Sequence, residues 1–314
     1  MNGWTAKWAH QMADSWKVTA YGKKPLIQGA LLAHDDALDW DPEVVLSGCE
    51  IADDQPDDWM LEAWYPRRPG AADKQAIKAL FAGQAPALSV EKLDDQDWLT
   101  LSQEGVEPIT AGRFHVHTPD HPPSEDGDLT SFVIPASQAF GTGQHETTAG
   151  CLAMLTLMKS SGVTARNVAD IGTGTGLLAF AALDLWPRAH ATASDIDPVC
   201  TGVVESNAEA NGFVMGHRAG ELTMIIADGM EHPLLQARGP YDVLIANILA
   251  GPLVELAPGF AASVPAGGHI LLAGLLTEQE QTVRRAYRRA GFRLAKRLVN
   301  GDWSILWLRK RTTG

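Results

Sequence analysis

The sequence predicts an α/β protein with a doubly wound, Rossmann-like sheet in its larger C-terminal part and a small α+β domain before it. Three observations support this prediction. Helical and strand patterns alternate from about residue 146 onward, which is typical of parallel α/β sheets. The strand patterns there are short apolar runs, as expected where helices cover both faces of a sheet. The first 95 residues are acidic, rich in tryptophan and mostly strand-like, so two domains are expected.

In the N-terminal part, three segments have the composition of strands: 44–51, 58–66 and 86–93. A helix is expected over 70–83, because its apolar residues recur at helical spacing. This strand–strand–helix–strand order fits part of a small α+β domain. Residues 1–40 show no pattern that assigns them to an element. We expect the N-terminal domain to span 1–95.

A connector is expected over residues 96–130. Residues 112–119 and 129–136 are strand-like, and the segment between them is rich in turn-forming residues. We expect these two strands to pair as a hairpin leading into the C-terminal domain, 131–314.

The C-terminal domain contains the alternating pattern. Helices are expected at 147–162, 175–186, 198–212, 251–264 and 278–291. Thr147 and Thr148 are suited to cap the start of the first of these helices. Strands are expected at 167–172, 190–195, 222–228, 241–247 and 267–275. The last two strand-like segments, 292–299 and 302–310, are separated by Asn-Gly, a hairpin turn signal.

Composition limits the class of protein. The net charge of −13 argues against binding driven by a nucleic-acid backbone, so no direct nucleic-acid binding is expected. The three cysteines are far apart and lack CxxC spacing, which argues against a disulfide framework or a zinc site. The N-terminus has no apolar signal core, and no apolar run could span a bilayer. We expect a cytoplasmic protein with no membrane partner.

A glycine-rich loop, "DIGTGTG", follows the first strand of the C-terminal domain. Gly172, Gly174 and Gly176 would let a ligand approach the backbone closely above a helix N-terminus. The spacing differs from the dinucleotide pattern G-x-G-x-x-G. Asp170 precedes the loop, and its carboxylate would repel a pyrophosphate but attract a cation. S-adenosyl-L-methionine fits, because it carries a sulfonium and an amino group and no phosphate. The alternative is a glycine turn needed only for packing.

Two more acids end the next two strands. Asp195 lies 19 residues after Gly176, near the spacing at which an acid binds ribose hydroxyls. Asp197 is better suited to start the following helix. Asp228 could accept a hydrogen bond from an adenine amino group, or be an ordinary loop aspartate. Together these acids outline sites for the sulfonium and amine, the ribose and the base.

Asn247 ends the fourth strand of this domain. In methyl transfer to an amine, the enzyme's main task is to orient a neutral amine toward the methyl carbon. The amide oxygen of Asn247 could accept the amine's hydrogens and leave its lone pair facing the methyl group. The alternative is that Asn247 caps the following helix.

These motifs resemble a known family. "AFGTGQHETT", "DIGTGTGLLAFAAL", "SDIDPVCTGVVESNAEANG" and "ANILAGPLVELAP" resemble the bacterial methyltransferases of ribosomal protein L-eleven (L11), in the expected order, from about residue 95 to 314. The resemblance implies a class I, S-adenosyl-L-methionine-dependent methyltransferase that trimethylates lysine side chains and the N-terminal amine of L11. It implies cofactor binding by Thr148, Gly172, Asp195 and Asn247. It also implies a ferredoxin-like N-terminal domain that holds the substrate protein and swings on its linker.

The segment from Phe140 to Thr148 is expected to close over the methionine end of the cofactor, with Phe140, Thr147 and Thr148 in contact with it. His145 lies in this segment. It could act as a general base, since a lysine ammonium with a pKa near 10.4 must lose a proton, or it could order the loop or orient the substrate. No other residues are spaced to complete a metal site with it.

Two alternative functions remain open from the sequence. A related lysine methyltransferase with another protein substrate would have the same C-terminal domain. A nicotinamide-dependent oxidoreductase is disfavoured by Asp170, the glycine spacing and the terminal hairpin.

Overall fold

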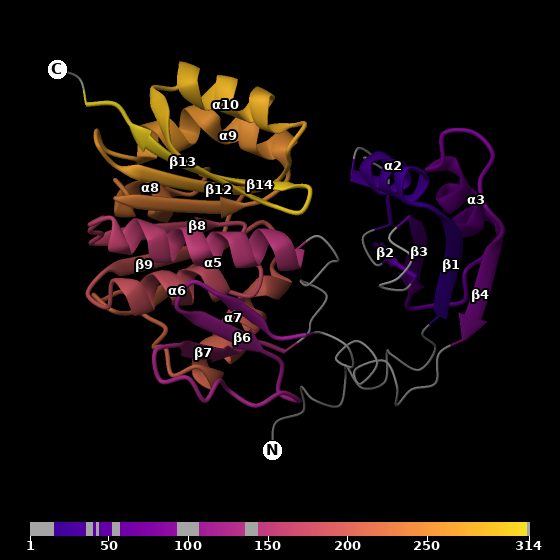
Figure 1. The fold of residues 1–314 in the computed structure, drawn as a ribbon, viewed down its shortest axis with the longest axis horizontal. Helices are drawn as coiled ribbons and strands as arrows, with labels where there is room; N and C mark the ends of the chain where they lie inside the picture. Colours follow the sequence, from indigo (N-terminus) through magenta and orange to yellow (C-terminus); the bar gives the residue numbers. More distant parts are fainter. Residues whose placement is uncertain are drawn as a thin grey trace. The chain divides into compact units, whose positions relative to one another are not determined.

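The computed structural model describes residues 16–35, 40–41, 44–51, 57–92, 107–135 and 144–312. The chain divides into two compact units, 1–105 and 106–314. Each unit has its own elements and its own hydrophobic core (Figure 1).

The described residues of the N-terminal unit form a four-stranded antiparallel sheet and two helices. Its elements are β1 (Trp16–Lys23), α2 (Lys24–Asp35), β2 (Val45–Glu50), β3 (Asp58–Tyr65), α3 (Ala71–Ala79) and β4 (Leu88–Lys92). The strand order is β2-β3-β1-β4, a split β-α-β arrangement. The first strand–helix pair, β1 and α2, comes from the region that the sequence pattern left unassigned. Side chains of β1, β3 and both helices form one core, which includes Val18, Ile27, Leu61 and Ile77.

A small three-stranded sheet begins the second unit. Its strands are β5 (Ile109–Ala111), β6 (Phe114–His117) and β7 (Thr130–Val133). β5 pairs with β6 antiparallel, but β6 pairs with β7 in parallel. The expected hairpin between 112–119 and 129–136 is therefore wrong. The intervening segment, 118–129, is long enough for a crossover, which parallel neighbours require.

The central sheet of the second unit has seven strands. They are β8 (Asn167–Ile171), β9 (His190–Asp195), β10 (Leu222–Ile226), β11 (Val243–Asn247), β12 (His269–Leu276), β13 (Phe292–Asn300) and β14 (Trp303–Lys310). The order is β10-β9-β8-β11-β12-β14-β13. The first five strands are parallel, and β14 is antiparallel to both β12 and β13. The doubly wound sheet and its terminal hairpin at Asn300-Gly301 are thus confirmed.

Helices cover both faces of this sheet (Figure 1). On one face lie α5 (Gln144–Ser160), α6 (Leu177–Leu185) and α7 (Val199–Ala210), and on the other lie α8 (Pro233–Arg238), α9 (Ala250–Ser263) and α10 (Glu280–Arg289). Alternate residues of each central strand enter opposite cores: Val243 and Ile245 of β11 face the first, Leu244 and Ala246 the second. None of the helices in the described part of the chain is long and apolar enough to cross a membrane.

The start of α5 differs from the sequence prediction. The helix begins at Gln144, so Thr147 and Thr148 lie within its first two turns and do not cap it. Glu146, in the first turn, suits the positive end of the helix dipole. Both threonine side chains are buried.

Candidate functional site

The predicted site residues lie at the carboxyl ends of four neighbouring strands of the sheet. The strand order reverses between β8 and β11, which are adjacent and parallel although two strands separate them in sequence. Ligands of doubly wound sheets bind at this switch point, at the carboxyl ends of the strands. Asp170 is on β8, Asp195 ends β9, Asp228 follows β10, and Asn247 ends β11. The fold therefore brings together residues that lie far apart in sequence.

Asp170 is the most unusual of these residues. Its side chain is 1% exposed. Thr173 donates a hydrogen bond from Oγ1 to Asp170 Oδ2 at 2.6 Å, whereas Oδ1 is buried and has no hydrogen-bond partner among the described residues. Burial raises the pKa of Asp170 to about 7, although the Thr173 hydroxyl and the Ala179 amide oppose this shift. A buried carboxylate with a free acceptor oxygen is a suitable ligand for a cation.

The glycine loop connects β8 to α6. The amides of Gly172 and Thr173 both donate to the carbonyl of Ser194, at 2.8 and 2.9 Å, and Gly176 immediately precedes α6. Gly172 has a φ of +72°, a conformation that favours glycine. A Cβ at Gly172 would also collide with the side chain of Ile248. This glycine is therefore needed for packing, and that requirement is compatible with a ligand above the loop.

Asp195 is bound to the glycine loop. Its Oδ2 accepts a hydrogen bond from the amide of Gly174 at 2.9 Å, and its Oδ1 accepts one from the amide of Asp197 at 3.1 Å. Each carboxylate oxygen has two lone pairs, so acceptor capacity remains for ribose hydroxyls. The carboxylate thus fixes the position of the loop, a role that sequence reasoning missed. Asp197 accepts from the amide of Val199, the first residue of α7, at 2.9 Å, as expected for a residue that starts this helix.

Asp228 lies in the turn after β10 and is exposed. Its carbonyl accepts a hydrogen bond from the amide of Glu231 at 3.0 Å. Asp228 therefore lies at the carboxyl ends of the strands, as Asp170 and Asp195 do.

Asn247 is the last residue of β11, opposite Ala273 of β12, and is partly exposed. The helix-cap interpretation of this residue is wrong, because α9 begins at Ala250 with Leu249 at its N-cap position. The amide of Asn247 therefore follows the strand end and takes no part in capping α9.

Ile248 holds the segment after Asn247 in place. Its side chain lies against Gly172, and its backbone lies against Gly274 in a bulge of β12. Gly274 has a φ of +82°, and a Cβ there would collide with the Ile248 carbonyl. Sequence reasoning missed Gly274. The available signal was an isolated glycine inside an apolar strand, which often marks a bulge or a close backbone approach.

The predicted wall of the site is only partly described. Phe140 lies outside the described residues. His145 belongs to the first turn of α5, and its side chain is outside the described part of the chain. The terminal hairpin holds this turn, because Asn300 Nδ2 donates to the carbonyl of Glu146 at 3.0 Å.

The acids that the structure brings together fit S-adenosyl-L-methionine. Asp170 offers a buried carboxyl oxygen without a hydrogen-bond partner among the described residues, which suits a cationic amino group, whereas a pyrophosphate there would be repelled. Asp195 and Asp228 follow the next two strands along the same edge. In the described ranges, no three His, Cys, Asp or Glu side chains gather as a metal site.

Comparisons with known proteins identify the family. The sequence model of the family "Ribosomal protein L11 methyltransferase (PrmA)" matches residues 41–311. Proteins with the name ribosomal protein L11 methyltransferase include one from Agrobacterium fabrum, 36% identical over 85% of this chain and 90% of its own length. Another, from Rhizobium meliloti, is 42% identical over 69% and 72%. A crystal structure of a ribosomal protein L11 methylase from Lactobacillus delbrueckii subsp. bulgaricus shares the fold, with a TM-score of 0.55 and 24% identity over 66% of this chain and 98% of that one. The chain belongs to the ribosomal protein L11 methyltransferase family.

Proposed function

We propose that this protein transfers methyl groups from S-adenosyl-L-methionine to amino groups of ribosomal protein L11, namely lysine side chains and the N-terminal amine. Family membership supports a methyltransferase that acts on this substrate. The structural observation that carries the proposal is the buried, half-partnered carboxylate of Asp170 beside the strand end that bears Asn247.

Each predicted residue has a distinct role at the cofactor. Asp170 would accept hydrogen bonds from the amino group, Asp195 from the ribose hydroxyls and Asp228 from the adenine amino group. Gly172, Gly174 and Gly176 would keep the loop backbone close to the ligand. Phe140, Thr147 and Thr148 would cover its methionine end. When bound, the cofactor supplies an electrophilic methyl group on a sulfonium.

Asn247 would orient the substrate amine. Its side-chain oxygen accepts a hydrogen from a neutral amine and leaves the nitrogen lone pair free for in-line displacement. The contact between Ile248 and the two glycines around it fixes the backbone that carries this amide. His145 would orient the substrate or accept the proton that an ammonium must lose.

The N-terminal domain would recognise the substrate protein. The predicted boundaries are 1–95 for recognition, 96–130 for the linker and 131–314 for methyl transfer. Because the substrate is a component of the ribosome, we place the enzyme in the cytoplasm.

A direct assay tests this function. Purified protein, radiolabelled cofactor and ribosomal proteins from cells that lack the enzyme would be mixed, and the labelled protein identified by mass. Label on L11 is the expected result. Label only on another ribosomal protein would refute the substrate and favour a related lysine methyltransferase. Retention on immobilised NAD but not on immobilised S-adenosylhomocysteine would refute methyl transfer itself.

A further inference from the structure

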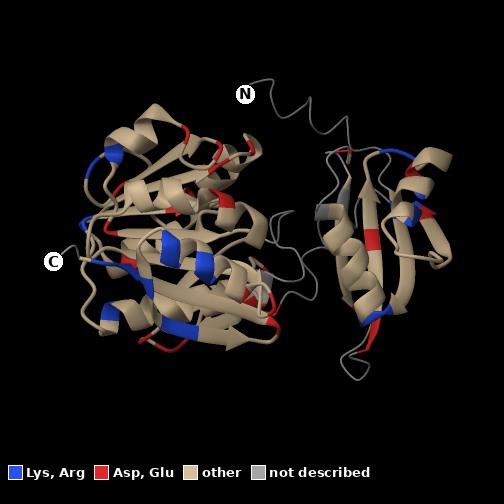
Figure 2. Cartoon of the chain, turned by 90° about the horizontal axis from the view of Figure 1, so that it is seen from above, with Lys and Arg blue, Asp and Glu red and all other residues tan. Residues whose placement is uncertain are grey.

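Positive charge is concentrated at the end of the chain that the function above does not use. Residues 278–311 contain ten lysines and arginines and three acids, a net charge of +7, in a chain whose net charge is −13. These residues form α10 and the β13–β14 hairpin. In the view from above in Figure 2, blue bands that mark its arginines lie along α10. Because −13 minus +7 is −20, the rest of the chain carries a net charge of −20, whereas residues 278–311 are basic.

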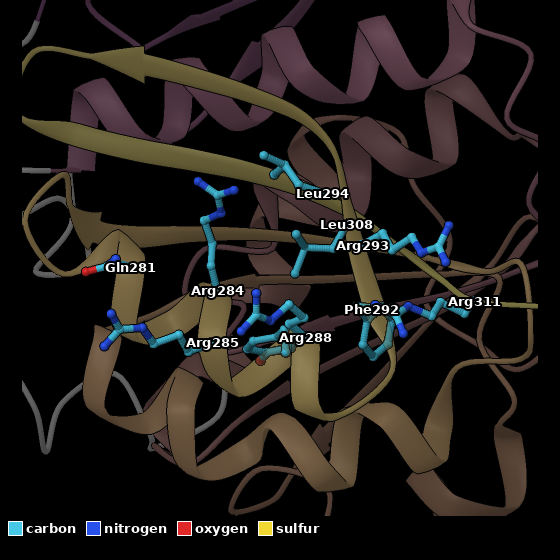
Figure 3. Close-up of a pocket in the computed structure, with 10 residues that line it drawn as sticks. Gln281, Arg284, Arg285, Arg288, Phe292, Arg293, Leu294, Leu308 and Arg311 are labelled. Atoms are coloured by element: carbon cyan, nitrogen blue, oxygen red, sulfur yellow. The ribbon is translucent and has the colours of Figure 1, made fainter.

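Five arginines surround a hollow of about 480 Å³ on this surface. They are contributed by α10 on one side and by β13 and the residue after β14 on the other (Figure 3). We call this set the arginine groove: Arg284, Arg285, Arg288, Arg293 and Arg311. Tyr287, Phe292 and Leu308 are buried and form its apolar floor.

Most of this positive charge is not neutralised within the protein. Arg284 forms an ion pair with Glu280 at 2.9 Å. The other four groove arginines are exposed, and none has an ion pair with another described residue. Along α10, Arg284 and Arg285 lie one turn before Arg288 and Arg289, and like charges at this spacing destabilise a helix.

A second feature of the groove also lacks a partner. Tyr287 is fully buried, and its hydroxyl has no hydrogen-bond partner among the described residues. Burial raises the pKa of Tyr287 above its ordinary value, so the hydroxyl remains a neutral donor. Exposed arginines without ion-pair partners around one hollow are features of a surface that binds an anion, and the Tyr287 hydroxyl is buried beneath them.

We propose that the arginine groove binds the phosphodiester backbone of RNA. Arginine forks match phosphate oxygens in bidentate geometry. Beyond the hollow, exposed Lys296 continues the positive charge along the edge strand β13, whereas the neighbouring Arg297 pairs with Glu280. A row of cations longer than the hollow fits a chain of phosphates better than a single nucleotide. The preference for RNA over an acidic peptide rests on the proposed function, because a ribosomal protein is assembled next to RNA.

Two simpler explanations account for only part of the pattern. Lysine and arginine on an edge strand such as β13 can prevent edge-to-edge aggregation, but this does not explain the arginines of α10. A solvated helix face usually mixes both signs, whereas residues 284–289 contain four arginines and no acid. The whole-chain charge argued against a nucleic-acid partner, but binding depends on the local field.

The test measures binding of a short fluorescein-labelled single-stranded RNA to the full-length protein by fluorescence anisotropy, over about 50 to 200 mM salt. The triple variant Arg285→Ala/Arg288→Ala/Arg293→Ala is compared with Arg166→Ala/Arg188→Ala/Arg218→Ala, which removes the same charge from three exposed positions outside the groove. We expect the groove variant to bind at least about tenfold more weakly, with a salt slope smaller by about two to three. The control variant should bind RNA like the wild type.

Competition separates the possible ligands. We expect unlabelled RNA to displace the probe, and polyglutamate or ATP at equal charge to do so poorly. Equal RNA affinity of the two triple variants would overturn the proposal. Displacement by polyglutamate as efficient as that by RNA would also overturn it and assign the groove to an acidic protein, and efficient displacement by ATP would assign it to a mononucleotide. Affinity for S-adenosylhomocysteine and methylation of free L11 should be unchanged in the groove variant. A failure of the RNA-binding proposal can therefore be distinguished from a failure of the proposed methyltransferase function.

Discussion

Burial of the Asp170 carboxylate destabilises the protein when no ligand is bound. Its pKa in the folded chain is about 7, against about 3.9 for an unperturbed aspartate. Between these values the folded protein binds more protons than the unfolded chain, so the free energy of unfolding falls as pH rises from about 4 to about 7. The loss is on the order of 4 kcal/mol and is complete above pH 7. A cation that binds the carboxylate would reverse this loss.

The first prediction concerns Asp170→Asn. The variant should be more stable than the wild type at pH 8 without ligand, and the difference should shrink towards pH 4. Its affinity for S-adenosylhomocysteine should fall roughly 10- to 100-fold, because a charge-assisted hydrogen bond is lost. Urea unfolding at several pH values and titration calorimetry measure the two effects. Glu205→Gln, at an exposed position on α7, serves as control. Unchanged affinity in Asp170→Asn would remove Asp170 from the cofactor site.

The second prediction concerns Asn247. Because the residue neither caps α9 nor lies in a core, Asn247→Ala should fold normally and bind S-adenosylhomocysteine within about tenfold of the wild type. Turnover should fall by about 100-fold or more, since the amine is no longer aimed at the methyl carbon. Asn247→Asp retains an acceptor oxygen and should keep more turnover than the alanine variant. Turnover of Asn247→Ala near that of the wild type would contradict the assigned role.

At the scale of elements, the bulge in β12 is required by the loop after β11. Gly274→Ala places a Cβ against the Ile248 carbonyl at a φ of +82°. Gly162→Ala is a matched control, with a φ of +85° and no atom within 4 Å of the added Cβ. Both variants should lose roughly 1–2 kcal/mol of stability from backbone strain. Only Gly274→Ala should also lose about tenfold or more in kcat, because displacement of Ile248 moves Asn247. Equal kcat in the two variants would show that the collision is relieved without moving Asn247.

The sequence predicted elements well where local chemistry determines them. Asn300-Gly301 predicted the terminal hairpin, and the apolar runs predicted the five parallel strands. The prediction failed where contacts between residues far apart in sequence determine the start of a helix or the pairing of a strand. Thr147 and Thr148 resembled helix caps, but α5 begins three residues earlier, where Asn300 holds its first turn. The turn-rich segment 118–129 resembled a hairpin connection, but β7 pairs in parallel with β6. Local patterns contain no information about which strand becomes the neighbour.

The same limit applied to the site. Asp170, Asp195 and Asn247 were predicted from their positions at strand ends, and the sheet order places them together. The contacts among them could not be predicted, since Asp195 binds the glycine loop across 21 residues and Gly274 lies against Ile248 across 26. The sequence also could not predict that Asp170 Oδ1 lacks a hydrogen-bond partner among the described residues, because this depends on how the surrounding side chains pack.

For the whole molecule, the two compact units and their separate cores suggest where the chain can be divided. The second unit begins at Val106. Phe114 and Val116 of β6 belong to the same core as α5 and α6, and the ring of Phe114 stacks on that of Phe132 at 5.5 Å. A fragment that starts at residue 131, the predicted domain boundary, would lack Phe114 and Val116. Losing one large buried side chain already costs about 3–5 kcal/mol, a large share of the stability of a typical domain.

We therefore expect a fragment of residues 106–314 to fold and to bind S-adenosylhomocysteine within about threefold of the full-length protein, since its cores and strand ends are intact. A fragment of residues 131–314 should be unfolded or aggregated under the same conditions. Methylation of L11 by the longer fragment should fall by about 100-fold or more at low substrate concentration, because the domain that holds the substrate is missing. Circular dichroism, calorimetry and the label-transfer assay measure these three outcomes. Methylation by residues 106–314 at the full-length rate would show that the N-terminal domain does not recognise the substrate, and a stable 131–314 fragment would show that β5 and β6 are dispensable for the fold.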